Sequence, residues 1–368
     1  MSWEVDGRVP SQVWEPRDSD ELLEMLGRAQ REGLSVIPWG GGTGMALGGV
    51  PSRYDVALST AGLKRLVMLS PDDLVVTVEA GMTLAELDAH VAPHGLRLPL
   101  DPPAPDQATV GGVLATNGYG PLRHSQGTPR DLVLGIKVGM SDGRPLKGGG
   151  QVVKNVSGYD LVRLMVGSSG TLGVIFEATF KLLPRPAASR WLELSCASPA
   201  FCEEWLERLS GPDFRLSSLE LYRDGGLTLY IGLEGEPEMV EAQAALVPDA
   251  RRCEGIPQVD GPLVIKASVL PSDVVPLLER VDGVAVLGAA GLGVLRFFCP
   301  PQKAWVDRIR QAVHAVGGTV VVERAPVDIK RGVRIWDDPG DSLPWMRQVK
   351  DTLDPTGTFS PGRFVDGL

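Results

Sequence analysis

The stretch Pro38-Trp-Gly-Gly-Gly-Thr-Gly44 directly follows a short apolar segment, Leu34–Ile37, that is typical of a buried strand. A diphosphate needs several backbone N–H groups directed at one place with no Cβ in the way, and glycine supplies both. The hydroxyl of Thr43 adds one more donor. The stretch therefore indicates a phosphate-binding loop, although these residues alone are equally typical of a flexible surface turn.

Two common phosphate motifs do not describe this loop. No Lys-Ser or Lys-Thr pair follows the glycines, which excludes the Walker type. Residues Met45–Val50 are typical of a loop and not of a long helix, which excludes the G-x-G-x-x-G dinucleotide fingerprint. The loop alone therefore does not identify the class of ligand, and the rest of the chain is needed for that.

A second stretch of small residues, Thr109-Val-Gly-Gly112, continues as Val113–Gly118, and a third glycine cluster occupies Gly167–Gly173. Two such loops from separate parts of one domain can bind opposite sides of one anionic cofactor. The alternative is that Gly111–Gly112 simply allows a helix to pack tightly on a strand. For the third cluster the alternatives are a backbone passing along a planar ring and an ordinary turn.

Length and charge narrow the classes of function. A chain of 368 residues exceeds one ordinary core of about 100–200 residues, so we expect two domains. Hydrophobic residues make up 43% and charged residues 22%, which is a globular composition and not a disordered one. The net charge is −10 and no basic stripe is present, which excludes a typical nucleic-acid binder.

Cysteine usage and the apolar segments predict a cytoplasmic protein. The four cysteines are Cys196, Cys202, Cys253 and Cys299. They form no C-x-x-C pair, which argues against zinc and iron–sulfur ligation, and we expect buried thiols in a reducing compartment. The start Met1–Asp6 lacks the apolar run of a signal peptide. The longest apolar stretch, Gly283–Leu295, is too short to span a membrane.

The order of helix and strand signals divides the chain in two. Asp18 with Glu21, and Thr83 with Glu86, have the spacing of capping boxes and predict two helix starts. Pro184-Arg-Pro186 predicts a domain boundary. The strands expected after it are Trp191–Ser195, Leu219–Tyr222, Leu227–Ile231, Leu263–Ala267, Val284–Leu287, Val294–Phe298 and Thr319–Val322. The helices expected between them are Ala200–Leu209, Pro237–Leu246, Pro271–Val281 and Gln302–Val316. This pattern predicts a sheet covered by helices, and no internal repeat is recognisable in it.

Taken in order, the segments of the first half closely resemble the FAD-binding domain of the vanillyl-alcohol oxidase / p-cresol methylhydroxylase type. The resemblance spans residues 1–186, and the tail Asp354–Phe364 is similar to the end of glycolate oxidase and D-lactate dehydrogenase flavoproteins. The length of the chain and the run Gln151–Asp160 also resemble the smaller FAD-binding subunits of bacterial glycolate oxidase (glycolate dehydrogenase). The matching segments are Pro38–Gly44, Val76–Gly81, Asp101–Pro102, Thr109–Asn117, Arg130–Gly135, Lys154–Asp160 and Gly170–Ile175.

The resemblance implies an α+β fold in three parts. Residues 1–186 would form a two-part FAD-binding domain of the vanillyl-alcohol oxidase type, and residues 187–330 a ferredoxin-like α+β cap domain. Residues 331–368 would form a C-terminal segment that returns to the FAD-binding domain. The cofactor-binding residues that the resemblance implies are Pro38, Trp39, Gly40, Gly41, Gly42, Thr43, Gly44, Pro102, Thr109, Gly111, Gly112, Thr116, Gly170 and Ile175.

The histidines set this chain apart from the large glycolate and lactate flavoproteins. Those relatives carry an H-x-G-D-G-N-type motif in the cap, which this sequence lacks. The four histidines are His90, His94, His124 and His314. No metal site is predicted, because the one close pair, His90 and His94, is interrupted by Pro93, which should end their helix. Since no histidine lies near the first glycine loop, we expect FAD to be bound non-covalently.

No catalytic residue can be assigned from the sequence. Hydride transfer from a 2-hydroxy acid needs a base for the hydroxyl proton and a cation for the carboxylate. The available cations in the later part of the chain are Arg324, Lys330, Arg331, Arg334 and Arg363. Each is more typical of an ordinary surface charge. His314, which precedes Gly317, is more typical of the last turn of a helix than of a base.

The resemblance leads to a first functional hypothesis and leaves two alternatives open. The chain would be the FAD-binding subunit of a glycolate oxidase complex, with a larger flavoprotein subunit and an iron–sulfur subunit as partners. The complex would oxidise glycolate, a 2-hydroxy acid, to glyoxylate, and it would be cytoplasmic or associated with a membrane through its partners. The alternatives are a self-sufficient FAD-dependent 2-hydroxy acid dehydrogenase, similar to D-lactate dehydrogenases, and a non-catalytic scaffold with a flavoprotein fold.

Overall fold

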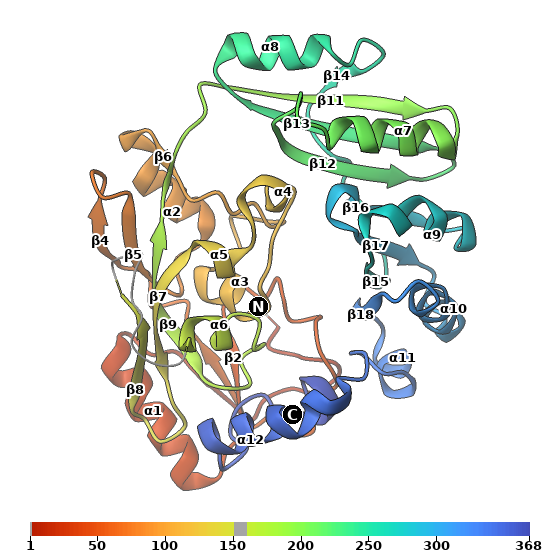
Figure 1. Ribbon diagram of the computed structural model, residues 1–368. Coiled ribbons are helices and arrows are strands. Elements are labelled where there is room, and N and C mark those ends of the chain that lie inside the picture. Colours follow the sequence, from red (N-terminus) through yellow and green to blue (C-terminus); the bar gives the residue numbers. More distant parts are fainter. Residues whose placement is uncertain (1, 151–159) are drawn as a thin grey trace. The chain divides into compact units, whose positions relative to one another are not determined.

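The structure is a computed structural model that describes residues 2–150 and 160–368. The chain forms two compact units (Figure 1). The first contains Met1–Gly120, Gly127–Arg185 and Asp338–Leu368, and the second contains Pro121–Gln126 and Pro186–Asp337. The chain therefore passes from the first unit to the second at Arg185–Pro186, within the proline-rich segment. Residues 121–126 belong to the second unit although the chain on both sides of them belongs to the first, and no sequence signal predicted this.

A small parallel sheet begins the first unit. Its strands, in spatial order, are β1 (Gln12–Trp14), β3 (Val56–Ser59) and β2 (Val36–Trp39). Helix α1 (Ser19–Glu32) packs its buried Leu22, Leu26 and Ala29 into the same core as Val36 and Val56. Because β2 ends at Trp39, the glycine-rich stretch begins where this strand leaves the sheet.

An antiparallel sheet makes up the other part of the first unit. Its strands, in spatial order, are β4 (Leu66–Ser70), β5 (Val75–Glu79), β9 (Val174–Lys181), β7 (Val133–Gly139) and β8 (Pro145–Gly149). The helices that accompany it are α2 (Leu84–Val91), α3 (Val110–Thr116), α5 (Pro129–Leu132) and α6 (Leu161–Met165). The unit ends with α12 (Leu343–Leu353) and an irregular tail. The two-part architecture expected from the sequence is present.

The capping signals were correct as helix starts, but only one is a complete capping box. At α2 the Thr83 side chain accepts from the Glu86 N–H, and the Glu86 carboxylate accepts from the Thr83 N–H. At α1 the Asp18 carboxylate accepts from the Glu21 N–H, but the Glu21 carboxylate pairs with Arg17 instead of returning to the cap. The neighbouring arginine therefore competes successfully for the second half of the box.

One eight-stranded antiparallel sheet forms the second unit. Its spatial order is β14-β11-β13-β12-β16-β17-β15-β18. The strands are β11 (Ala188–Cys196), β12 (Leu216–Arg223), β13 (Leu227–Gly235), β14 (Arg251–Cys253), β15 (Leu263–Ser268), β16 (Ala285–Ala289), β17 (Val294–Cys299) and β18 (Thr319–Arg324). The helices are α4 (Arg123–Gln126), α7 (Pro199–Leu209), α8 (Pro237–Ala245), α9 (Val274–Arg280), α10 (Lys303–His314) and α11 (Val327–Gly332).

The second unit contains the same topology twice. The order β11-α7-β12-β13-α8-β14 is a ferredoxin-like βαββαβ unit, and β15-α9-β16-β17-α10-β18 is a second one. The two halves join at β12 and β16, where Leu221, Tyr222 and Arg223 pair with Gly288, Leu287 and Val286. The ferredoxin-like cap is thus correct and is duplicated. The sequence showed no internal repeat, but the structure contains one at the level of topology. It was missed because the two halves share the order of their helices and strands but no recognisable sequence motif.

No helix in the described part of the chain combines the length and the apolar character that a bilayer crossing requires.

Candidate cofactor-binding site

A cavity of the first unit brings together five separate segments of the chain. It is bordered by Ile37–Met45 at the end of β2 and in the loop that follows, by Thr60, by α3, by the turn before β9 with the first residues of that strand, and by Ser360 and Arg363 of the C-terminal tail. All of the predicted cofactor-binding residues line this cavity except Pro102 and Thr109. The two glycine stretches and the third cluster, Gly167–Gly173, therefore contribute to one site.

The glycines of the first loop are required by the neighbouring segment of the protein. A Cβ on Gly40 would overlap the hydroxyl of Thr109, and a Cβ on Gly41 would overlap the carbonyl oxygen of Gln107. A Cβ on Gly44 would lie 2.8 Å from the Thr116 methyl carbon. The loop thus rests against the chain around α3 so closely that only glycine fits. Tight packing, which was the alternative for the second stretch, is thus present at the first stretch as well as at Gly111 of the second.

Unpartnered donors face this cavity. Gly42 has a φ of +80°, which glycine adopts freely. Within the described residues, no backbone carbonyl accepts a hydrogen bond from the N–H groups of Gly40–Gly44. The buried Trp39 Nε1 and Ser169 Oγ, both on cavity-lining residues, also have no partner there. Buried donors such as Trp39 Nε1 and Ser169 Oγ normally have an acceptor, and together with the N–H groups of the loop they fit an anionic, oxygen-rich group such as a diphosphate.

The second stretch is a helix and not the loop that its small residues suggested. Thr109 is the N-cap of α3, and its Oγ1 accepts from the Gly112 N–H at 3.3 Å. At the other end, Thr116 Oγ1 donates to the Gly112 carbonyl at 2.8 Å. Gly111 faces Ala80, the residue after β5, and a Cβ on Gly111 would come within 2.9 Å of the Ala80 Cβ. Thr109 therefore supports the cavity from outside its lining.

The turn before β9 has a strained backbone. Ser169 has a φ of +53°, which is uncommon for a residue with a side chain, and Gly170 follows with +68°. The Ser169 N–H donates to the Ala115 carbonyl at 2.7 Å, and Ser360 Oγ donates to the Gly170 carbonyl at 3.0 Å. These contacts from α3 and from the tail hold the serine in its conformation.

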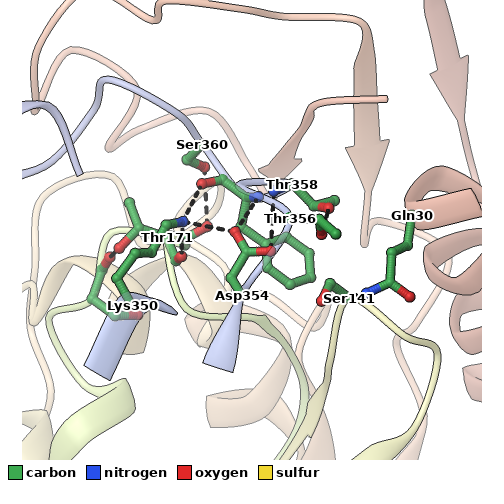
Figure 2. Close-up of polar contacts among 11 residues, drawn as sticks. Gln30, Ser141, Thr171, Lys350, Asp354, Thr356, Thr358 and Ser360 are labelled. Atoms are coloured by element: carbon green, nitrogen blue, oxygen red, sulfur yellow. Dashed lines mark hydrogen bonds and ion pairs between the residues drawn. The ribbon is translucent and has the colours of Figure 1, made fainter. Parts of the chain in front are cut away.

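A buried polar cluster fastens the C-terminal tail beside this turn (Figure 2). Lys350 Nζ donates to Asp354 Oδ2 at 2.7 Å, to the Thr171 carbonyl at 2.7 Å and to the Phe359 carbonyl at 3.0 Å. The Asp354 carboxylate accepts from the N–H groups of Thr358 and Phe359 at 3.0 and 2.8 Å. The cluster thereby fixes the backbone that leads into Ser360.

Arg363 closes the cavity from the tail. Only 4% of the residue is exposed, and its guanidinium forms an ion pair with Asp6 Oδ2 at 2.9 Å. It also donates to the carbonyls of Met45, Leu47 and Gly49. Burial lowers the pKa of Arg363, and Asp6 opposes that shift. The side chain therefore anchors the end of the glycine loop.

Arg363 and Lys330 were interpreted from the sequence as surface charges, and both interpretations were wrong. Lys330 is 5% exposed, in the second unit. Arg324 pairs with Asp260 on the surface, as expected of an ordinary charge. Arg331 and Arg334 are exposed as well.

The histidines are distributed over both units. Helix α2 ends at Val91, so Pro93 interrupts His90 and His94 as predicted. His314 is the last residue of α10, and its Nε2 lies 3.0 Å from Asp337 Oδ2. His124 lies in α4, where burial lowers its pKa.

Three serines that line the cavity were not among the predicted site residues. Ser168 and Ser169 lie in the third glycine cluster, Gly167–Gly173, which had been noted without assigning a role to its serines, and Ser360 lies in the tail Asp354–Phe364, which was noted only for its family likeness. Of the run Gln151–Asp160, residues 151–159 lie outside the described residues. Asp160 is described, and its carboxylate caps α6 by accepting from the Arg163 N–H.

Comparison with known proteins bears on both the fold and the site. A family model described as an FAD binding domain matches residues 10–149. Glycolate oxidase subunit GlcE of Escherichia coli (strain K12) is 30% identical over 371 residues, which cover 95% of this chain and 98% of that protein. Glycolate oxidase subunit GlcD of Bacillus subtilis (strain 168) is 25% identical over 96% of this chain and 89% of its own length.

Two further proteins are similar to this chain, one over about half of its length and one over nearly all of it. D-lactate dehydrogenase of Archaeoglobus fulgidus is 41% identical over 173 residues, and this match spans 47% of this chain and 39% of that protein. A solved structure of alkyldihydroxyacetonephosphate synthase superposes with a TM-score of 0.74 at 16% identity, covering 96% of this chain and 77% of the other. The latter likeness shows a shared fold.

Proposed function

The chain belongs to the family of FAD-binding glycolate oxidase subunits that includes GlcE, and from this premise we propose that it binds FAD in the cavity of its first unit and takes part in oxidising a 2-hydroxy acid. The substrate proposed is glycolate and the product glyoxylate. The observation that carries the proposal is the cavity itself, where a glycine loop with unpartnered N–H groups meets Ser169 and Trp39.

When bound, FAD supplies the acceptor for the hydride that leaves the hydroxyl-bearing carbon of the substrate. The protein's part is to hold and orient that group. In the proposal the N–H groups of Gly40–Gly44 bind the diphosphate, and Trp39 Nε1 and Ser169 Oγ donate to it or to the adjoining polar atoms. Lys350 and Arg363 support the site indirectly, because their charged groups bond to other protein groups and not to the cofactor.

The residues lining the cavity favour cofactor binding over proton transfer. In the described part of the chain they are glycines, small hydroxyl residues and apolar residues, with Arg363 as the one charged side chain. Its guanidinium is already bonded to Asp6 and three backbone carbonyls. This composition supports a subunit that holds FAD while a base elsewhere in a complex accepts the substrate proton.

We therefore place the chain in a complex with a larger flavoprotein subunit and an iron–sulfur subunit. The similarity to proteins named as glycolate oxidase subunits supports this assembly. FAD is proposed to be bound non-covalently, since the cavity lining contains glycine, serine and threonine where a covalent link would need a nucleophilic side chain such as histidine or cysteine. The proposed location is the cytoplasm, with any membrane association made through the partners.

Affinity purification from the native host tests the proposal. We expect a yellow complex that contains the partner subunits, and acid precipitation should release free FAD from this chain. Separately, the purified chain is mixed anaerobically with glycolate or D-lactate. Slow or absent flavin reduction supports the subunit assignment, and rapid turnover with an artificial acceptor would show a self-sufficient dehydrogenase. A colourless chain that cannot be reconstituted with FAD would show a scaffold.

A further inference from the structure

Helix α8 of the second unit carries a row of exposed apolar side chains. Met239, in its first turn, is 50% exposed, and Leu246, at its C-terminal cap, is 40% exposed. Ala242 lies between them in the sequence and is exposed as well. The spacing of three and four residues places these side chains on one side of the helix, next to the face that buries Val240 and Val247. Exposed apolar side chains that lie together are typical of protein interfaces.

The duplicated topology supplies a matched helix for comparison. Helix α10 occupies in the second half of the unit the place that α8 occupies in the first, since each connects the third strand of its half to the fourth. No residue of α10, all of which the structure describes, leaves a large apolar side chain exposed. The same place in the fold can therefore be built with a polar outer surface, and the architecture does not require the exposed Met239 and Leu246.

The two halves also differ in charge. Residues 188–253, the first half, contain twelve acidic and six basic residues, whereas residues 263–324, the second half, contain five acidic and seven basic residues. With histidine neutral, the formal net charges are therefore −6 and +2. Because the halves share their topology, the fold does not require this difference either. A strongly acidic surface favours association with a basic one.

The apolar row lies among acidic side chains. Helix α7 packs in the same core as α8, and Arg208 of α7 donates to the Leu246 carbonyl at 3.1 Å. This bond joins α7 to the end of the apolar row. The exposed acidic residues on and beside the two helices are Glu203, Glu204, Glu207, Glu236, Glu238, Glu241 and Asp249. Glu241 pairs with Arg190, and in the described part of the chain the other six form no ion pair. These carboxylates are therefore available to cations of another molecule.

We propose that the outer surface of α7 and α8 is a docking surface for a partner subunit, and that the matching surface of this subunit is basic around an apolar centre. The inference rests on the proposed function, which supplies the complex. Met239 and Leu246 enter the apolar centre, and the surrounding lysine or arginine side chains pair with the carboxylates of α7 and α8. A second copy of this chain fits less well, because it would place acidic residues against acidic residues.

The test compares two full-length variants that add the same charges to equivalent helices. Met239→Lys/Leu246→Lys adds two lysines to α8, and Ala304→Lys/Ala315→Lys adds two to α10, in both cases one in the first turn and one at the C-terminal cap. All four positions are exposed. Both variants should therefore keep the thermal unfolding temperature and the FAD content of the unaltered chain, which shows that they fold.

The measured quantity is the dissociation constant of each chain for the larger flavoprotein subunit and the iron–sulfur subunit, purified together. We expect the α8 variant to bind these subunits at least roughly tenfold more weakly, whereas the α10 variant binds like the unaltered chain. Raising sodium chloride from about 50 mM to about 500 mM should also weaken the unaltered complex, because salt screens exposed charges.

Four other outcomes would each decide against the inference. Equal binding by the α8 variant would remove the docking surface and leave the proposed complex intact. Binding that the α8 variant loses but that salt does not change would contradict a basic partner. A dimer of the unaltered chain that the α8 variant loses would assign the surface to a second copy. If the unaltered chain bound neither subunit, the proposed complex itself would fail, and the docking surface with it.

Discussion

Lys350 and Asp354, one helical turn apart at the end of α12, form a buried ion pair in which Nζ lies 2.7 Å from Oδ2. The Asp354 side chain is completely inaccessible and that of Lys350 is 10% exposed. Every strong donor and acceptor of the pair is used, because the ammonium also bonds two carbonyls and the carboxylate two N–H groups. The pair therefore organises the tail, and breaking it should affect the cavity.

Lys350→Met should destabilise the chain by about 3–5 kcal/mol, because the Asp354 carboxylate would be left buried without its counter-charge. The measurement is the free energy of unfolding in urea, together with FAD affinity, which should fall as the tail loosens. Arg347→Met is the control, since Arg347 pairs with Asp366 on the surface and exposed pairs contribute little. The double variant Lys350→Met/Asp354→Asn should recover part of the loss. Equal stability of the Lys350 and Arg347 variants would contradict this account.

Gly41→Ala should weaken FAD binding by roughly tenfold or more, because relieving the overlap of its Cβ with the Gln107 carbonyl must move the loop, at about 1–3 kcal/mol. Flavin fluorescence during titration of the apoprotein measures the affinity. Gly332→Ala is the matched control, since a Cβ there meets open space. If both variants bound FAD equally well, the loop would not depend on this close contact.

Arg363→Met should destabilise the chain by about 3–5 kcal/mol, because it breaks the buried ion pair with Asp6 and removes the donor to the carbonyls of the 45–49 loop. Thermal unfolding should shift downward, and FAD should be lost from the purified variant. Adding Asp6→Asn removes the charge that Arg363 neutralised, so the double variant should be more stable than Arg363→Met alone. It should still bind FAD weakly, because the loop carbonyls remain without Arg363.

Stability should fall as the pH drops below about 6.5, the ordinary pKa of histidine, partly because of His124. Burial lowers the pKa of His124, and among the described residues its Nδ1 has no partner. The unfolded chain therefore takes up this proton at a higher pH than the folded chain, so acidification favours unfolding. His124→Phe should flatten the dependence of the unfolding free energy on pH between 7 and 5. His90→Phe, at an exposed position, should leave the dependence unchanged.

The elements of the second unit were predictable because each has a strong local signal. The expected strand Leu219–Tyr222 lies inside β12, and the expected helix Gln302–Val316 contains α10. β14 was missed because Arg251–Cys253 is short, polar and at the edge of the sheet. The duplicated topology was missed because register and strand order arise from long-range pairing, which local patterns do not report.

The candidate site was predictable only where glycine was required. The first loop was found because glycine is the residue that a close backbone approach demands. Arg363 was misread because its partner, Asp6, is 357 positions away in the sequence. Lys350 gave no signal although its counter-charge, Asp354, is only four residues away, because one of the backbone acceptors that fixes the buried ammonium, the Thr171 carbonyl, is 179 positions away. A buried charge can be predicted only when the groups that bond to it are known, and groups far away along the chain cannot be identified from local sequence patterns.

The chain leaves the first unit for the second and later returns to the first, and this order has a consequence for biosynthesis. The residues 121–126 precede most of the unit to which they belong, and the first unit is resumed only at Asp338. Val36, at the start of the strand that leads to the glycine loop, acquires its parallel partner Phe359 only after the second unit has been made. A ribosome-bound chain thus lacks the tail side of the cavity until residues 338–368 have been added. We therefore expect the proposed cofactor to be loaded after the second unit has been synthesised, and a chain cut before Asp338 to lack its flavin.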